Sequence, residues 1–374
     1  MRRLRDQADR PAELSGNRVP VVARREQSDA MPNHLIERSD TMHRSPATRV
    51  PRAASIRRPA RCATEPSAGA ALRRLLSLAF GLLSLAGCIS TSAPSSKTTE
   101  GDAAKPASVL VDAAWLADRL DNDRIVVVDA RNPVDFARDR IPGAVNVTPE
   151  MLLDSNPENG TNMAGVTAIQ EVFGKAGIDM EHTVVVYDAG SDYRAAARVF
   201  WVLEVHGHPA VAVLNGGYAN WRATKRPLTA TPREPTPRTF VATVRPERYA
   251  TKLSVLRAVN DQSAVVLDAR SDDEYAGRTS KAARSGHVAT AIHVDAVKNL
   301  VVSEDGVCSV AYSDELARLY RDRLDPKKKI IAYCNSGNRA SVSYLALRSL
   351  GFDAAVYDGS WLEWGNDPHT PIEK

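Results

Sequence analysis

Cysteine is scarce in this chain of 374 residues, which contains only Cys62, Cys88, Cys308 and Cys334. Four cysteines are too few for a scaffold held by disulfides, and none of them has the spacing of metal ligands. The sequence therefore predicts no disulfide framework and no metal centre, and we expect no organic cofactor.

A strong excess of one charge is also missing from the part of the chain that can fold. The whole chain has a formal net charge of +4, but residues 1–87 hold 16 arginines against 8 acidic residues. From Cys88 onward, 33 basic residues face 37 acidic ones. This slightly acidic balance gives no support for a nucleic-acid partner.

The N-terminal part lacks the periodic apolar pattern of a folded domain. Residues 1–71 are rich in Arg, Pro, Ala and Ser and poor in aromatics, so we expect a disordered extension or a wrongly assigned start. Residues 72–88 contain an arginine pair, a short apolar run and Leu-Ala-Gly-Cys, which is the layout of a secretory signal. Because a signal normally begins near the first residue, we expect translation to start later, at Leu72 or at Met42.

The apolar run of this signal is too short to span a bilayer. The four residues that end at Cys88 resemble a bacterial lipoprotein box, which implies that Cys88 becomes a lipidated N-terminus. Residues 89–105, rich in Ser, Thr and Lys, would then form a flexible tether. We expect an exported protein anchored to the cell envelope and facing the periplasm or the exterior. The alternative is a buried apolar helix with an incidental cysteine.

The rest of the chain repeats itself with a period of about 140 residues. Val126-Val-Val-Asp-Ala-Arg131 recurs as Val265-Val-Leu-Asp-Ala-Arg270, and Asn215-Gly-Gly-Tyr-Ala-Asn-Trp221 corresponds to Asp358-Gly-Ser-Trp-Leu-Glu-Trp364. Short β-branched runs alternate with helical patterns, which predicts two α/β domains built on mainly parallel sheets. We place the domains at residues 106–228 and 245–374, joined by the proline-rich linker 229–244.

The segment from Ile330 to Ser341 contains the best candidate for an active site. An apolar strand leads into Cys334, and helical spacing of apolar residues begins after Ser341. A cysteine between a strand and a helix lies near inward-pointing loop amides and the positive end of the helix dipole. Such a thiol should ionise readily, and the thiolate is the nucleophile. The alternative is a buried structural cysteine.

The length of the loop indicates which anion it holds. Four residues separate Cys334 from Arg339, one fewer than in the Cys-x5-Arg loop of cysteine phosphatases, and a smaller ring suits one sulfur better than a phosphate. Together with the repeat, this loop resembles that of the tandem rhodanese (sulfurtransferase) family. The resemblance implies five-stranded sheets and a persulfide on Cys334. It also implies a catalytically silent first domain, because Asp188 stands where the second repeat has its cysteine.

The resemblance also implies roles for other residues. The loop residues Asn335, Ser336, Gly337 and Asn338 would hold the persulfide, and Arg339 would bind an anionic donor unless it merely faces solvent. Arg198 is a further candidate for substrate binding in the cleft between the domains. Three residues near the loop are expected to be structural: Asp268, Arg270 and His287.

Two departures from thiosulfate-type relatives bear on the donor. Basic residues are expected after the cysteine and before the aromatic Tyr275, but this chain has Asn335, Ser336 and Glu274 there. Arg278 and Arg284 are nearby candidates to compensate. We still expect thiosulfate or a related anion as donor, cyanide or a thiol as acceptor, and a monomeric enzyme. The alternatives are a 3-mercaptopyruvate sulfurtransferase, a sulfur carrier for a protein partner, a cysteine phosphatase or arsenate reductase, and a non-catalytic binding module.

Overall fold

The computed structural model describes residues 106–374, apart from residues 157–159, 161 and 312. The predicted extension, signal and tether, and the predicted lipidation site Cys88, lie outside the described residues. Among the helices that the model describes, none combines the length and the apolar character required to cross a membrane.

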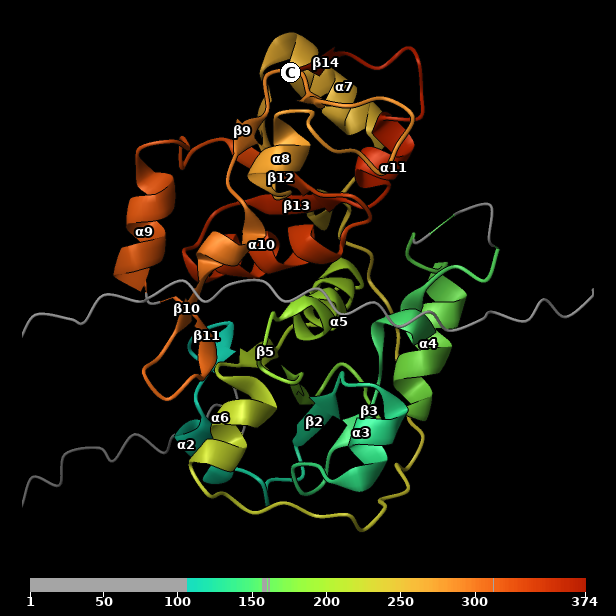
Figure 1. The fold of residues 1–374 in the computed structure, drawn as a ribbon. Coiled ribbons are helices and arrows are strands. Elements are labelled where there is room, and N and C mark those ends of the chain that lie inside the picture. The colour runs from blue at the N-terminus through green and yellow to red at the C-terminus, as the bar shows by residue number, and fades with distance from the viewer. Residues whose placement is uncertain (1–105, 157–159, 161, 312) are drawn as a thin grey trace, which may run out of the picture. The chain divides into compact units, whose positions relative to one another are not determined.

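Each repeat folds around a five-stranded parallel sheet (Figure 1). The strand order is β1-β5-β4-β2-β3 in the first repeat and β6-β13-β12-β7-β9 in the second, so the same topology occurs twice. The first sheet consists of β1 (Leu110–Val111), β2 (Ile125–Asp129), β3 (Val145–Asn146), β4 (Thr183–Tyr187) and β5 (Val211–Leu214). The second consists of β6 (Tyr249–Ala250), β7 (Ala264–Asp268), β9 (Ile292–His293), β12 (Lys329–Tyr333) and β13 (Ala354–Tyr357). The predicted fold class is confirmed.

Helices flank both sheets, as expected when every connection joins parallel strands. The first repeat contains α2 (Ala113–Ala117), α3 (Pro133–Arg138), α4 (Val166–Lys175), α5 (Arg194–Val205) and α6 (Gly217–Ala223). The second contains α7 (Lys252–Asp261), α8 (Asp272–Tyr275), α9 (Ser313–Arg321), α10 (Asn338–Ser349) and α11 (Ser360–Trp364). Short 3₁₀ turns lie at Pro149–Leu152, Pro246–Arg248 and Ala296–Asn299.

Both faces of each sheet are buried. Along β12, Ile330 and Ala332 belong to one buried apolar cluster, and the alternate residues Ile331 and Tyr333 belong to another. Side chains of a strand point alternately to opposite faces, so a strand between two helical layers is apolar throughout. Cys334 continues the first series and belongs to the same cluster as Ile330.

The two repeats pack against each other through α5 and α10. Buried residues surround α10 on all sides, because its own sheet covers one side and α5 covers another. Polar contacts join the same helices: Glu204 accepts hydrogen bonds from the Tyr344 hydroxyl at 2.5 Å and from Arg348 Nε at 3.0 Å. The helix that follows Cys334 is therefore held by both repeats.

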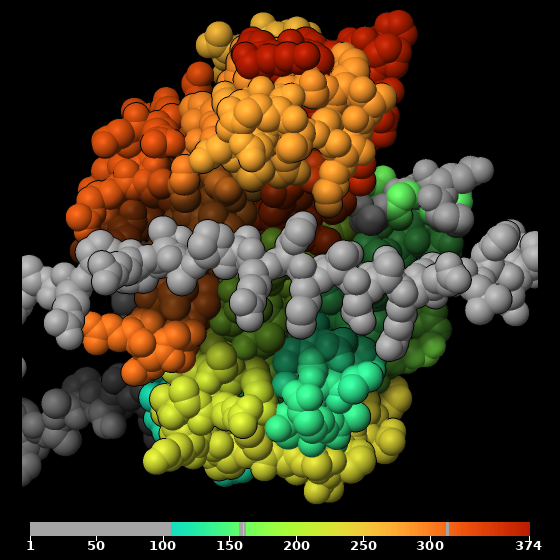
Figure 2. Space-filling model, in the orientation of Figure 1, coloured from blue at the N-terminus to red at the C-terminus, as the bar shows by residue number. Residues whose placement is uncertain are grey.

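A β-hairpin of the second repeat also reaches the first. It consists of β10 (Leu300–Val302) and β11 (Cys308–Val310), and Figure 2 shows its orange atoms close to the yellow-green atoms of the first repeat. The Val310 amide donates to Asn215 Oδ1 at 2.8 Å, and the Tyr193 hydroxyl donates to the Cys308 carbonyl at 3.1 Å. A small antiparallel two-stranded sheet pairs β8 (His287–Val288) with β14 (Ile372–Glu373) near the end of the chain.

The segment between the repeats is extended and lies along the first repeat. It forms no helix or strand, and its Arg238 and Thr243 amides donate to carbonyls of Gly174 and His206 at 2.9 and 3.0 Å. The linker is thereby fixed to one domain over much of its length.

Candidate active site

Cys334 follows β12, the central strand of the second sheet, and is 2% exposed. Three residues separate it from the first residue of α10, and Gly337 caps this helix with a φ of +82°. Only glycine adopts this left-handed conformation without strain, so it allows the sharp turn from strand to helix. The structure places Cys334 between a strand and a helix, as the sequence pattern predicts.

A pocket of about 450 Å³ opens at Cys334. Its lining is made of Arg194, Glu274, Lys281, Cys334, Asn335, Ser336, Asn338 and Arg339. Five of the predicted site residues therefore lie together around it. Three lining residues are cationic, and one of these, Arg194, belongs to the first repeat. The first repeat thus forms part of the wall of this pocket.

The backbone amides of the loop divide into two groups. The amides of Cys334 and Gly337 both donate to Ser360 Oγ at 3.2 Å, so this hydroxyl fixes the two ends of the turn. The amides of Asn335, Ser336 and Asn338 find no acceptor in the described part of the chain. Because these three residues line the pocket, their amides are available to an anion bound beside Cys334.

Arg339 is not free to face a ligand with its whole guanidinium group. Its two terminal nitrogens donate to the carboxylate of Glu274 at 2.7 and 3.0 Å. Burial of the Glu274 carboxyl opposes its charge, but hydrogen bonds from Arg339, the Ser271 amide and Asn335 outweigh burial and hold its pKa well below its usual range. The pair is therefore charged at neutral pH, and Glu274 occupies the bidentate face that we expected an anionic donor to use.

Arg198 lies beneath the loop instead of in the pocket lining. Its side chain is fully buried and forms an ion pair with Asp358, with Nη1 to Oδ1 at 2.5 Å. Asp358 also accepts the Met163 amide at 2.7 Å. A Cβ added to Gly337 would come within 2.6 Å of both Arg198 and Asp358, so this pair packs directly against the turn that follows Cys334. This contact indicates that Arg198 positions the loop and does not bind substrate directly.

Asp268 and Arg270 form a buried pair at the end of β7. The carboxylate binds Arg270 at 2.6 Å and also accepts a hydrogen bond from the Tyr333 hydroxyl. Because Tyr333 directly precedes Cys334, the pair fixes the end of the strand that presents the cysteine. His287 is bound through Nδ1 to the Tyr275 carbonyl at 2.8 Å and stacks on the Tyr275 ring. Neither the pair nor His287 lines the pocket.

The corresponding loop of the first repeat holds Asp188 at the end of β4. Its carboxylate is buried and accepts the amides of Gly190 and Ala196 at 2.9 and 3.1 Å. Burial raises the pKa of this carboxyl, and the two amide bonds oppose that rise. Five residues separate Asp188 from the start of α5, against three in the second repeat. The Asp188 carboxylate therefore accepts the amide hydrogen bonds that a bound anion would otherwise accept in this loop.

Four residues that shape the Cys334 site were not predicted in these roles. Arg194 and Lys281 line the pocket, Glu274 neutralises Arg339, and Ser360 ties the loop. No sequence signal indicated Ser360, because Gly217 stands at the corresponding place of the first repeat, and the place of Arg194 depends on how the two domains pack. Arg278 and Arg284 do not line the pocket: Arg278 pairs with Asp273, and Arg284 donates to backbone carbonyls, including that of Thr370.

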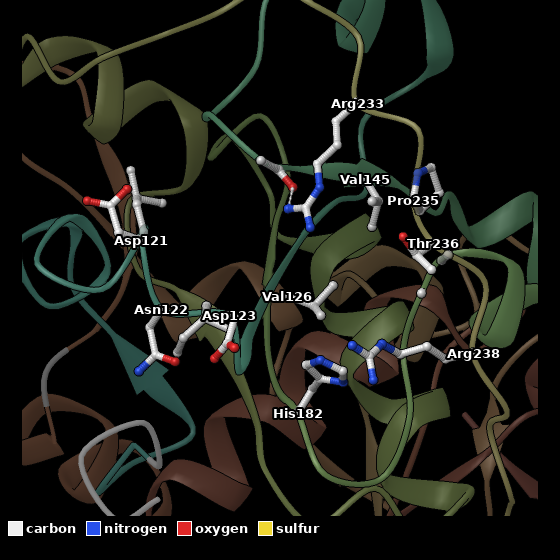
Figure 3. Close-up of a pocket in the computed structure, with 15 residues that line it drawn as sticks. Asp121, Asn122, Asp123, Val126, Val145, His182, Arg233, Pro235, Thr236 and Arg238 are labelled. Atoms are coloured by element: carbon white, nitrogen blue, oxygen red, sulfur yellow. Dashed lines mark hydrogen bonds between the residues drawn. The ribbon is translucent and has the colours of Figure 1, made fainter. Parts of the chain in front are cut away.

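A separate pocket of about 290 Å³ lies between the first repeat and the linker that follows it (Figure 3). Its lining includes the beginnings of β2 and β3, whereas Asp188 and Cys334 follow the ends of strands. Figure 3 shows Arg238 and His182 close together, and both contact Asp179, at 3.0 and 2.7 Å. Arg233 donates to the Gly143 carbonyl at 3.2 Å. None of the predicted site residues lines this pocket.

Comparisons with known proteins agree with the repeat. The model of the rhodanese-like domain matches residues 112–224 and again residues 251–367. Thiosulfate sulfurtransferase of Pseudomonas aeruginosa is 31% identical over 268 residues, covering 71% of this chain and 97% of the relative. The thiosulfate sulfurtransferase of Azotobacter vinelandii is 30% identical with the same coverage. The structure of SseA from Escherichia coli, described as a 3-mercaptopyruvate sulfotransferase, has a TM-score of 0.61 at 28% identity, covering 68% of this chain and 99% of that chain.

Proposed function

The chain belongs to the tandem rhodanese-domain family of thiosulfate and 3-mercaptopyruvate sulfurtransferases, and on this premise we propose a route for the sulfur. Cys334 takes a sulfane sulfur from thiosulfate or a related anionic donor and carries it as a persulfide. It then gives the sulfur to a thiophilic acceptor such as cyanide or a thiol. The observation that carries this proposal is the pocket at Cys334, with three cationic side chains and three loop amides that have no acceptor among the described residues.

Both half-reactions are displacements at sulfur. In the first, the Cys334 thiolate attacks the outer sulfur of thiosulfate, a new S–S bond forms, and sulfite leaves with the electron pair of the old S–S bond. In the second, the acceptor attacks the terminal sulfur of the persulfide, and Cys334 leaves as a thiolate. With cyanide the product is thiocyanate. This sequence is covalent ping-pong catalysis, in which one nucleophile holds the transferred group between two steps.

The loop supports the terminal sulfur of the persulfide. The amides of Asn335, Ser336 and Asn338 are suited to stabilise its negative charge. Arg194 and Lys281 supply positive charge to an incoming anion from two different domains. Lys281 has no ion-pair partner among the described residues, whereas Arg194 is 3.2 Å from Asp192. The donor therefore meets two exposed cationic side chains of the pocket lining and, beside the sulfur, backbone amides of the loop.

A donor panel tests the proposed substrate class. The purified protein is offered thiosulfate and 3-mercaptopyruvate, with cyanide or dithiothreitol as acceptor, and thiocyanate or sulfide is measured. Parallel lines in double-reciprocal plots are expected, because the donor product leaves before the acceptor binds. If the natural acceptor is a protein, we expect the Cys334 persulfide to form but small acceptors to take its sulfur slowly. Converging lines, which indicate that both substrates are bound together, would contradict the covalent route.

Replacing Asp188 by alanine should leave the chemistry almost unchanged, because the first repeat has no nucleophile at this place. The variant loses the acceptor of two buried amides, so we expect its free energy of unfolding to fall by about 1–3 kcal/mol. Sulfite release in a single turnover and a urea titration measure the two effects. If Asp188→Ala were as inactive as a Cys334 variant while remaining folded, the first domain would not be silent.

We propose further that the protein is exported and lipid-anchored through Cys88. The support is the sequence alone: the arginine pair, the short apolar run and the Leu-Ala-Gly-Cys box. Cys88→Ala should release the protein from the membrane fraction or leave its signal uncleaved, as immunoblots of fractionated cells would show. Cys308→Ala is the control, because this cysteine lies in the folded part of the chain, and the variant should stay in the membrane fraction. Wild-type protein in the cytoplasm with residues 1–87 still attached would exclude this anchor.

A further inference from the structure

We propose that Glu274 is a specificity-determining residue of the Cys334 pocket and that it acts against a second negative charge on the sulfur donor. This inference rests on the proposed function, because it concerns the donor half-reaction at Cys334. Glu274 is the one acidic residue in the described lining of that pocket. Its ionised carboxylate offsets the charge of Arg339 where the anionic donor must approach.

The Glu274 carboxylate accepts hydrogen bonds from residues at both ends of the loop. Its Oε1 accepts from Asn335 Nδ2 at 2.6 Å, beside the cysteine, and both oxygens accept from Arg339. The two side chains of this ion pair are only 11% and 19% exposed, so the pair is mostly buried beside the loop. Arg339 thereby contributes little net positive charge to the pocket. The remaining attraction comes from Arg194 and Lys281.

The position of Glu274 is set by its own helix, independently of any ligand. Glu274 is the third residue of α8 and forms a capping box with Ser271, whose amide and hydroxyl donate to Glu274 Oε2 at 3.1 and 2.9 Å. The carboxylate is thus held from α8 and from the loop at the same time. A donor that needed the bidentate face of Arg339 would have to displace a carboxylate with five hydrogen bonds.

The consequence for donors follows from charge. A dianion is repelled by Glu274 about twice as strongly as a monoanion at the same place, because Coulomb energy scales with the product of charges. Thiosulfate carries two negative charges, whereas methanethiosulfonate carries one and loses its outer sulfur by the same S–S cleavage, with methanesulfinate as leaving group. The two donors therefore differ in charge while sharing the chemistry of the step.

Glu274→Gln tests the proposal, because glutamine keeps the size of the side chain and can still form the capping box. The ratio of kcat/KM for thiosulfate to that for methanethiosulfonate should rise on the order of five- to tenfold, the effect expected for one unit charge a few ångströms away in a hydrated site. The rise should shrink at high salt. Asp273→Asn is the matched control: it removes the same charge from the same helix at an exposed side chain outside the pocket, and its ratio should stay constant.

The outcomes separate this inference from the proposed function. Equal loss of activity toward both donors in Glu274→Gln, or a rise equal to that of Asp273→Asn, would show that Glu274 only supports the loop and would overturn the inference while leaving the persulfide route intact. If wild-type protein transferred sulfur from neither donor, the proposed function would fail and this inference with it.

Discussion

Cys334→Ser is expected to reduce sulfur transfer to the uncatalysed background, a loss on the order of 10⁴-fold or more for removal of a covalent nucleophile. Serine cannot carry the sulfane sulfur as a persulfide, and the loop amides and cations cannot replace the missing nucleophile. The fold should survive, because the two side chains differ little in size. Thiocyanate formation and the melting temperature measure the two effects.

The control is Cys308→Ser, because Cys308 is also buried and is the other cysteine among the described residues. It lies in β11 at the contact between the repeats and does not line the Cys334 pocket. Its variant should keep nearly full activity. Substantial sulfur transfer by Cys334→Ser, or loss of transfer in Cys308→Ser with the fold intact, would show that the wrong cysteine had been assigned.

The second large effect is expected from Arg198→Met. The substitution leaves the fully buried Asp358 carboxylate without its cationic partner, and breaking a buried pair in this way costs about 3–5 kcal/mol. Because the pair packs against Gly337, the turn after Cys334 should also loosen. We expect a strong fall in the free energy of unfolding and, in the folded fraction, a lower rate of persulfide formation.

A double-mutant cycle makes this prediction specific. Asp358→Asn alone removes the negative charge that faces the buried Arg198 guanidinium, but the double variant removes both charges of this pair and should be more stable than the sum of the single effects implies. Arg278→Met, which breaks an exposed pair with Asp273, should change stability little. Additive effects at Arg198 and Asp358, measured by urea unfolding, would show that the pair is not coupled.

Much of the fold could be predicted from the sequence because the signal was repeated. The strands β2 and β7 are apolar up to their final aspartates, Asp129 and Asp268, which is characteristic of parallel strands between helical layers. The repeat indicated that the pattern was not accidental. The position of Cys334 followed from the change of periodicity at the end of β12. These features depend on residues that are close together in the chain, so they can be recognised from the sequence alone.

The chemistry of the pocket was harder to predict because it depends on contacts between distant segments. Glu274 and Arg339 are 65 residues apart, and neither the repeat nor the loop length indicates that they pair. Arg198 was expected in the cleft, but its partner Asp358 lies 160 residues away and holds it beneath the loop. Arg194 enters the pocket only because α5 packs on α10. Such long-range charge pairs leave no periodic pattern in the sequence.

The central claim, a persulfide on Cys334, is tested most directly by mass spectrometry of the wild-type protein after brief exposure to thiosulfate without an acceptor. We predict a gain of one sulfur atom per chain, located on the peptide that contains Cys334 and lost again when cyanide is added. Cys308→Ser should show the same gain, and Cys334→Ser should show none. An unchanged mass in the wild-type protein while thiocyanate is still produced, or the added sulfur on Cys308, would contradict the claim.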